Sequence, residues 1–191
     1  MYEEGIEIGI EKDLRNEVIA RKIYLSFPTK IFIGKEEIQF EITNAIANHF
    51  KIPITAVQVV GSGKTGYSYY KNKEFIDGSS DLDISIISEN LFIDYCETVL
   101  IETKGFKDLS NFGRTRDGDS KFESYRKYIN KGIFRPDLMP ACSARNKWFN
   151  FFNKLYEKHF ELFSSINAGI YLSQKFFEYK QSDNIDFYKK I

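Results

Sequence analysis

The chain has 191 residues, of which 42% are hydrophobic and 16% aromatic, which suffices for one compact domain with a buried core and excludes a disordered chain. Lys and Arg together number 27, as do Asp and Glu, so no net charge draws the chain non-specifically onto nucleic acid or anionic lipid. Cys96 and Cys142 match neither a metal spacing nor a disulfide framework, which indicates a reducing compartment.

The first residues are acidic and interrupted by Gly5 and Gly9, unlike a secretory signal, and no stretch approaches the roughly 20 apolar residues of a membrane span. A soluble cytoplasmic protein without a membrane partner is expected. From residue 11 to 26, apolar side chains recur at helical spacing, and Pro28 ends the pattern. This predicts an amphipathic helix within an N-terminal helical segment, residues 1–34.

Residues 35–50 repeat the helical period, and Pro53 separates them from a predicted buried strand over residues 56–60. The strand leads directly into Gly61-Ser62. Residues 63–80 are rich in Gly, Lys, Tyr, Asn and Ser without a period, which predicts a loop, and a second strand is expected over residues 81–88.

Helices are predicted over residues 89–103 and 121–131, followed by a short strand over residues 133–135 that Pro136 closes. From residue 144 onward, aromatic and aliphatic residues at helical spacing predict a helical C-terminal region. We therefore expect an α/β (α+β) fold with a small mixed sheet flanked by helices. Its parts are the segment 1–34, a core over 35–140 and a C-terminal helical region over 141–191, packed as one unit.

Asp81 and Asp83 are candidate metal ligands, because alternate residues of a strand project from the same face. Two such carboxylates repel each other unless a cation lies between them, and their hard oxygens suit Mg²⁺ or Mn²⁺. Two solvated acids at an exposed strand edge would show the same pattern. Gly61-Ser62 favours the metal site, because a glycine lets backbone N–H groups approach phosphate oxygens and the serine hydroxyl adds a donor.

The run Val60-Gly61-Ser62, followed by Asp81-Leu82-Asp83, resembles the signature of the nucleotidyltransferase superfamily of DNA polymerase β. The resemblance covers roughly residues 35–88, although the loop over 63–80 is longer than the family's usual spacer. It implies a palm-type sheet and a magnesium-dependent enzyme that transfers a nucleoside monophosphate from a nucleoside triphosphate to an acceptor hydroxyl.

The resemblance also implies a third carboxylate on a later strand that faces the first two. Asp137, after the short strand, is the best candidate, and its alternative is a turn or a helix cap. Asp117 and Asp119, in a loop that contains glycine, are weaker candidates.

Gly63-Lys64-Thr65 matches the end of a Walker A loop, but Gln58 stands where its first glycine should be and no helical pattern follows. Lys64 is a candidate phosphate contact or a solvated loop lysine. Between residues 104 and 147 there are eleven basic and five acidic residues, and Arg114, Arg116 and Arg135 are candidate clamps for a triphosphate or RNA, although ordinary solvated charges explain most such residues.

Three tyrosines in the long loop, Tyr67, Tyr69 and Tyr70, could stack on a base or pack to order the loop. By resemblance, small family members modify tRNA ends, proteins or small molecules, and some act in toxin–antitoxin pairs or phage defence. Two alternatives stay open, namely a synthase of oligonucleotide second messengers and a non-catalytic nucleotide-binding module that acts through a protein partner.

Overall fold

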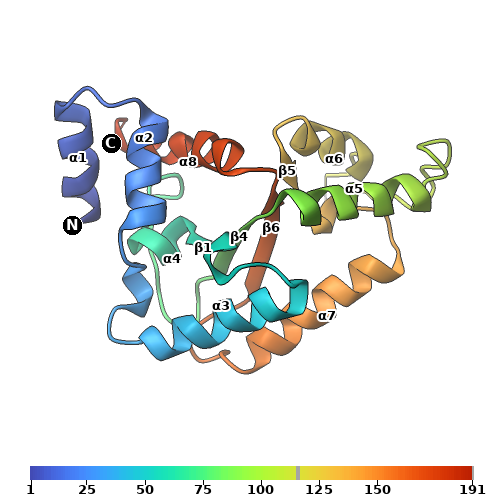
Figure 1. Ribbon diagram of the computed structural model, residues 1–191, viewed down its shortest axis with the longest axis horizontal. Coiled ribbons are helices and arrows are strands. Elements are labelled where there is room, and N and C mark those ends of the chain that lie inside the picture. The colour runs from blue at the N-terminus through green and yellow to red at the C-terminus, as the bar shows by residue number, and fades with distance from the viewer. Residues whose placement is uncertain (115–116, 191) are drawn as a thin grey trace.

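A computed structural model describes residues 1–114 and 117–190, which form a mixed α+β fold, as expected (Figure 1). Its main sheet has the strand order β1-β4-β6-β5. The strands are β1 (Val57–Val60), β4 (Leu82–Ile87), β6 (Ile166–Tyr171) and β5 (Ile133–Phe134). β4 is antiparallel to β1 and parallel to β6, and β5 is antiparallel to β6, so the sheet is mixed.

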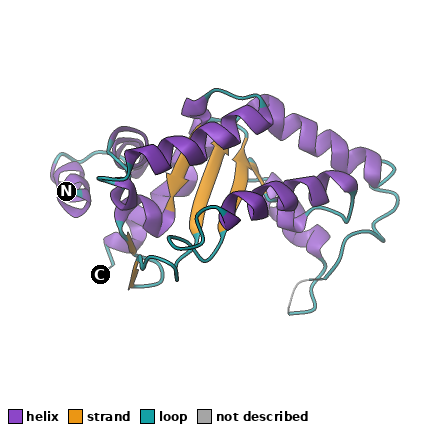
Figure 2. Cartoon of the chain, turned by 90° about the horizontal axis from the view of Figure 1, so that it is seen from below, coloured by secondary structure: helices purple, strands orange, loops and turns teal. Residues whose placement is uncertain are grey.

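Helices cover both faces of this sheet (Figure 2). The α-helices are α1 (Tyr2–Glu11), α2 (Asn16–Arg21), α3 (Glu36–Phe50), α4 (Gly61–Thr65), α5 (Glu89–Glu102), α6 (Lys121–Ile129), α7 (Ser143–Glu157) and α8 (Gln174–Tyr188). Shorter turns are the π-helical η1 (Lys22–Ser26) and the 3₁₀ helices η2 (Lys30–Phe32), η3 (Ile54–Ala56) and η4 (Pro136–Leu138). None of the helices in the described residues combines the length and the apolar character that a membrane crossing requires.

Alternation along β4 divides the core between the two faces of the sheet. Leu82, Ile84 and Ile86 are buried in a cluster with residues of α3, α5 and α7. The opposite face, which carries Asp83 and Ser85, is the one that α8 covers. There Val60 and Tyr171 pack in a second cluster with buried residues of α1, α2 and α8. The candidate site residue Asp83 belongs to this second face.

The helix predicted over residues 11–26 starts later, since α2 and η1 form it from Asn16 to Ser26, and the preceding helix α1 was not predicted. Gly5 and Gly9, which served in the sequence only as evidence against a secretory signal, lie inside α1 at close packing contacts. A Cβ on Gly5 would lie 2.8 Å from the Phe27 ring, and one on Gly9 would lie 2.7 Å from Ile19. The missing side chains let α1 approach the following helix closely, which outweighs the low helix propensity of glycine.

The prediction of a purely helical C-terminal region is also wrong, because β6 lies inside it and is an interior strand of the sheet. β6 reads Ile-Asn-Ala-Gly-Ile-Tyr, and a short apolar run of this kind cannot be distinguished from a buried helix by its period. Residues 63–80 are likewise more than a loop. They contain the end of α4 and the hairpin of β2 (Tyr67–Ser68) and β3 (Lys73–Glu74).

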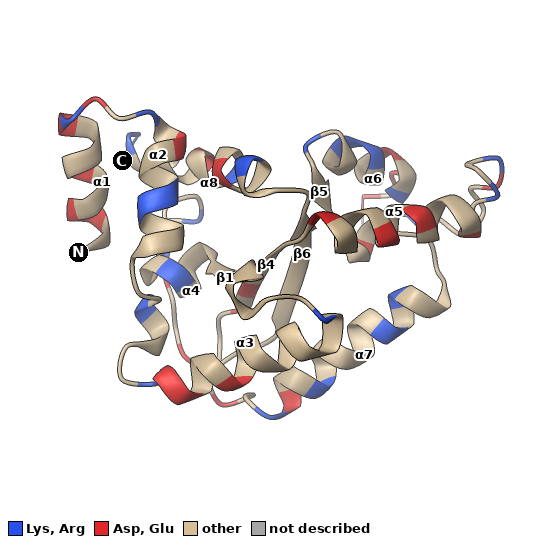
Figure 3. Cartoon of the chain, viewed as in Figure 1, with Lys and Arg blue, Asp and Glu red and all other residues tan. Residues whose placement is uncertain are grey.

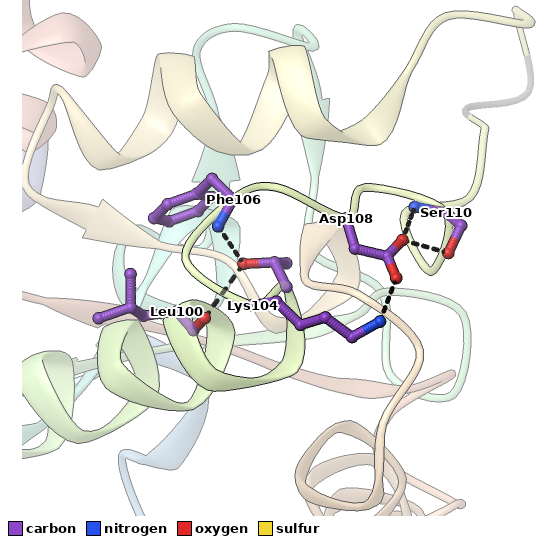
Figure 4. A network of polar contacts seen from close by, with 6 residues as sticks. Leu100, Lys104, Phe106, Asp108 and Ser110 are labelled. Atoms are coloured by element: carbon purple, nitrogen blue, oxygen red, sulfur yellow. Dashed lines mark hydrogen bonds and ion pairs between the residues drawn. The ribbon is translucent and has the colours of Figure 1, made fainter.

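The connection after α5 is held by its own polar contacts, which Figure 4 shows. Lys104 Nζ lies 2.9 Å from a carboxylate oxygen of Asp108, whose other oxygen accepts hydrogen bonds from the backbone N–H and the hydroxyl of Ser110. The Ser110 hydroxyl and the Lys104 ammonium together hold the pKa of Asp108 well below its ordinary value. Part of the basic character predicted for this region is therefore neutralised locally.

Candidate functional site

Gly61 lies beside Asp83, because the register of β1 and β4 places Val60 opposite Asp83. Gly61 follows at once, with a left-handed φ of +62°. A Cβ at this position would lie 3.1 Å from Asp83 Oδ2. Both the backbone conformation and the available space therefore require glycine. The predicted phosphate cradle and the predicted metal ligand adjoin each other.

Asp81 lies one residue before β4 and is held by a different part of the chain. The hydroxyls of Ser164 and Ser165 both donate to its Oδ1, at 2.8 and 2.7 Å. These serines directly precede β6, and Leu82 N–H bonds the carbonyl of Ser165, so the start of β4 is tied to the start of β6. Neither serine was predicted as a partner of Asp81, because β6 itself was not predicted.

Asp83 lines a cavity, and its side chain is exposed to solvent there. Partial desolvation by the surrounding protein atoms, together with the nearby charge of Asp81, raises its pKa to about 6, and Lys71 and Arg135 oppose the rise. Two neighbouring carboxylates are hard oxygen donors of the kind that a divalent cation such as Mg²⁺ prefers. The residues present therefore fit the metal that the sequence predicts.

Asn167 occupies the position beside Asp83 on the neighbouring strand, since the parallel register of β4 and β6 pairs the two residues. Its side chain shares the face of Asp83, and its Nδ2 donates to Ser165 Oγ at 2.9 Å. A chain of hydrogen bonds thus runs from Asn167 through Ser165 to Asp81. β6 carries no carboxylate, so a neutral amide stands next to the Asp81–Asp83 pair.

Asp137 lies in η4, beyond β5, and β6 separates β5 from β4. Its two carboxylate oxygens accept from Nε and Nη2 of Arg135, at 3.0 and 2.8 Å. The Arg135 guanidinium also donates to the Tyr128 hydroxyl and lies 4.9 Å from the centre of that ring. The structure thus gives Asp137 an arginine partner, and its role as a third metal ligand stays a prediction.

Replacing Asp137 by Asn separates these two roles. If Asp137 serves only as the partner of Arg135, in an ion pair that is about half-exposed, it contributes little to metal binding. In that case we expect Mg²⁺ affinity in the presence of nucleotide to change less than about twofold. Loss of a true metal ligand would lower it by at least about tenfold. Titration of Mg²⁺ by calorimetry measures the difference, and a tenfold loss would establish Asp137 as a ligand.

Lys64 is buried, with 4% of its side chain exposed, and its ammonium donates to the carbonyl of Phe27 at 2.7 Å. Burial lowers its pKa to about 8. Its amine is thus directed at the segment that follows α2, whereas the predicted role was a phosphate contact. Sequence reasoning did not foresee this arrangement because α4, which carries Lys64, was taken for a loop.

The stability of the protein should therefore rise with pH through Lys64. Folding lowers the pKa of Lys64, so between about pH 8 and 10 its amine is protonated in the unfolded state and neutral in the folded state. A rise in pH through this range therefore favours the folded state. From pH 7 to 9.5 the free energy of unfolding should increase by about 2 kcal/mol more in the wild type than in Lys64→Met. Urea denaturation at both pH values measures this, and equal pH dependence in the two proteins would refute it.

A cavity of about 710 Å³ opens beside Asp83, a size typical of small-molecule sites. Its lining includes several predicted residues, namely Gly61, Asp83, Arg135 and Asp137. Ser62, Lys64 and Asp81 are not among the lining residues, although Ser164 and Ser165, which bond the Asp81 carboxylate, are. Sequence reasoning missed the contributions of Asn167 and of α8, which supplies Lys180, Gln181 and Asn184.

Other candidate residues lie elsewhere. Arg114 donates to the carbonyl of Gly118, within the exposed turn that contains Asp117 and Asp119, and Arg116 lies outside the described residues. Of the three loop tyrosines, Tyr69 is buried against Tyr188, Tyr67 packs on Tyr69, and Tyr70 is exposed beside Phe187. These contacts anchor the hairpin to the end of α8.

Within residues 1–114 and 117–190, no group of three or more His, Cys, Asp or Glu side chains is arranged to hold a metal. Any cation at the Asp81–Asp83 pair would therefore need further oxygen ligands from a substrate or from water, as Mg²⁺ commonly does. Comparison of the chain with protein-family models, curated proteins and solved structures gave no match.

Proposed function

We propose that this protein is a Mg²⁺-dependent nucleotidyltransferase that moves a nucleoside monophosphate from a nucleoside triphosphate to an acceptor hydroxyl. The observation that carries the proposal is the proximity of Gly61 to Asp83. A turn whose backbone is left accessible by a glycine thus lies next to one of two adjacent carboxylates. A triphosphate that bears a divalent cation combines the two chemistries that such a site would bind.

The residues of the chain have distinct roles in this proposal. Asp81 and Asp83 hold Mg²⁺, and the hydrogen bonds from Ser164 and Ser165 fix the orientation of the Asp81 carboxylate. The backbone at Gly61-Ser62 receives phosphate oxygens. When bound, Mg²⁺ would supply charge stabilisation for the attacking and leaving oxygens.

Arg135 provides a positioned cation on the same cavity wall. Asp137 and Tyr128 hold its guanidinium in place through hydrogen bonds, and the guanidinium also lies over the Tyr128 ring. Its positive charge is close enough to Asp83 to lower the pKa of that carboxyl. A pre-oriented guanidinium is suited to phosphate or pyrophosphate oxygens. The acceptor is an RNA or tRNA end, a protein or a small molecule in a cytoplasmic setting, such as a toxin–antitoxin or defence system.

Asn167 favours a second candidate function, namely metal-dependent nucleotide binding without transfer, with the effect exerted through a protein partner. An amide oxygen is a weaker ligand than a carboxylate for a metal that would activate the acceptor hydroxyl. The position beside Asp83 would then support nucleotide binding more strongly than catalysis.

One experiment distinguishes the two functions. The protein is incubated with each α-labelled triphosphate, Mg²⁺ or Mn²⁺, and total RNA or lysate protein. Label transfer, pyrophosphate release and binding of the triphosphate to the protein are measured. Transfer that Asp81→Asn abolishes supports the enzyme. A binding module is identified if the wild type binds triphosphate in a metal-dependent way without transfer or pyrophosphate release, and if Asn167→Asp shows both. An absence of triphosphate binding in every condition would refute both.

A further inference from the structure

Gln181 of α8 is a buried amide that faces the cavity. Only 4% of its surface is exposed, and it lies one helical turn from the fully buried Phe177 and Ile185. It nevertheless lines the same cavity as Asp83 and Gly61. The helix therefore presents a polar side chain to the cavity from a rigid position within the second face of the core.

The hydrogen bonds of Gln181 are only partly satisfied by protein. Its Oε1 accepts from Asn184 Nδ2 at 3.2 Å, and Asn184 in turn hydrogen bonds with the buried hydroxyl of Tyr24. In the described parts of the chain, Gln181 Nε2 has no protein acceptor. This nitrogen is not fully buried, and Gln181 lines the cavity, so its N–H groups are accessible from the cavity.

Water that enters the cavity can pair with the free N–H groups of this amide, so a ligand that displaces that water must offer an acceptor in the same place. The hydrogen bonds through Asn184 and Tyr24 fix the orientation of the amide. Because its oxygen already accepts from Asn184, only its N–H donors remain for a ligand. Lys180, the neighbouring cavity residue, is paired with Asp183 at 2.6 Å and sits half-exposed. Gln181 is thus the cavity residue of α8 whose donors are both buried and free of protein partners.

We propose that Gln181 recognises the nucleoside part of the triphosphate by donating a hydrogen bond to an acceptor atom of its base or ribose. The inference rests on the proposed function, since Gly61, Asp81 and Asp83 would hold the phosphate and metal end of the same ligand. The cavity extends from that end to α8, so a single molecule of nucleotide size reaches both.

The test compares two probes, a nucleoside triphosphate and inorganic tripolyphosphate, each with Mg²⁺, in calorimetric titrations against four proteins. These are the wild type, Gln181→Leu, Gln181→Glu and the control Gln174→Leu. Gln174 lies in the first turn of α8, is exposed and bonds Glu178, so its change loosens the helix without touching the cavity. Melting temperatures show which variants remain folded.

We expect Gln181→Leu to weaken binding of the preferred triphosphate about tenfold and Gln181→Glu to weaken it further, since the new carboxylate opposes the ligand's acceptor. Tripolyphosphate affinity should stay unchanged in the neutral Gln181→Leu variant. Triphosphate binding that neither variant alters, or that the control weakens equally, would overturn the inference and leave the proposed function intact. A wild type that binds neither probe would overturn both.

Discussion

Replacing Asp83 by Asn is expected to abolish Mg²⁺-dependent triphosphate binding and transfer while leaving the fold intact. The loss should be about 100-fold or more, since a direct ligand contributes more than the outer partners whose loss costs about 10–100-fold. Asn keeps the shape of Asp but removes the charge that Asp81 and burial disfavour, so the melting temperature should be at least that of the wild type.

The appropriate control is Asp108→Asn, which removes an exposed carboxylate whose partners are Lys104 and Ser110, in the connection after α5 (Figure 4). It should leave triphosphate affinity and pyrophosphate release unchanged. Full activity in folded Asp83→Asn protein would remove Asp83 from the site. Equal losses in both variants would show that the assay responds to charge in general.

Replacing Gly61 by Ala should have the second large effect, because it acts on conformation and contact together. An alanine at a φ of +62° costs about 1–2 kcal/mol, and its Cβ would press on Asp83 Oδ2 at 3.1 Å. The carboxylate or the turn must then shift. We expect triphosphate affinity to fall at least about tenfold, beyond what the loss of stability explains.

Gly34 provides a matched control for this substitution. It also has a left-handed backbone, with a φ of +79°, but a Cβ there meets nothing within 4 Å. Gly34→Ala should therefore lose a similar amount of stability, measured by denaturation, and keep its triphosphate affinity. If both alanine variants bind triphosphate like the wild type, the proximity of Gly61 to Asp83 has no role in binding.

Basic and acidic residues are distributed over the helices and loops of the chain, as expected from their equal numbers in the sequence (Figure 3). The site instead depends on a few charges at the sheet. The sequence predicts β1, the glycine at its end and β4 well, because a buried strand, a glycine and alternating carboxylates are all local signals. Local patterns also predict α3 and the existence of α5, α6 and α7.

The rest of the site depends on contacts between distant segments. Asn167 was overlooked because the apolar residues of β6 fit a helical spacing, and only pairing with β4 shows that it is a strand. Arg135 was predicted as a phosphate clamp and Asp137 as a metal ligand. Because each was assigned a separate ligand, the ion pair between them was not predicted. Lys64 turns toward Phe27, 37 residues earlier, which no local pattern encodes.

The central claim is that phosphate and metal are bound together at Gly61, Asp81 and Asp83. Calorimetric titration of a nucleoside triphosphate into the wild type, with and without Mg²⁺, tests this most directly when it is repeated with Asp83→Asn. The account predicts binding that requires Mg²⁺ and is lost in the variant. Triphosphate binding that is independent of Mg²⁺ and equally strong in Asp83→Asn would contradict it.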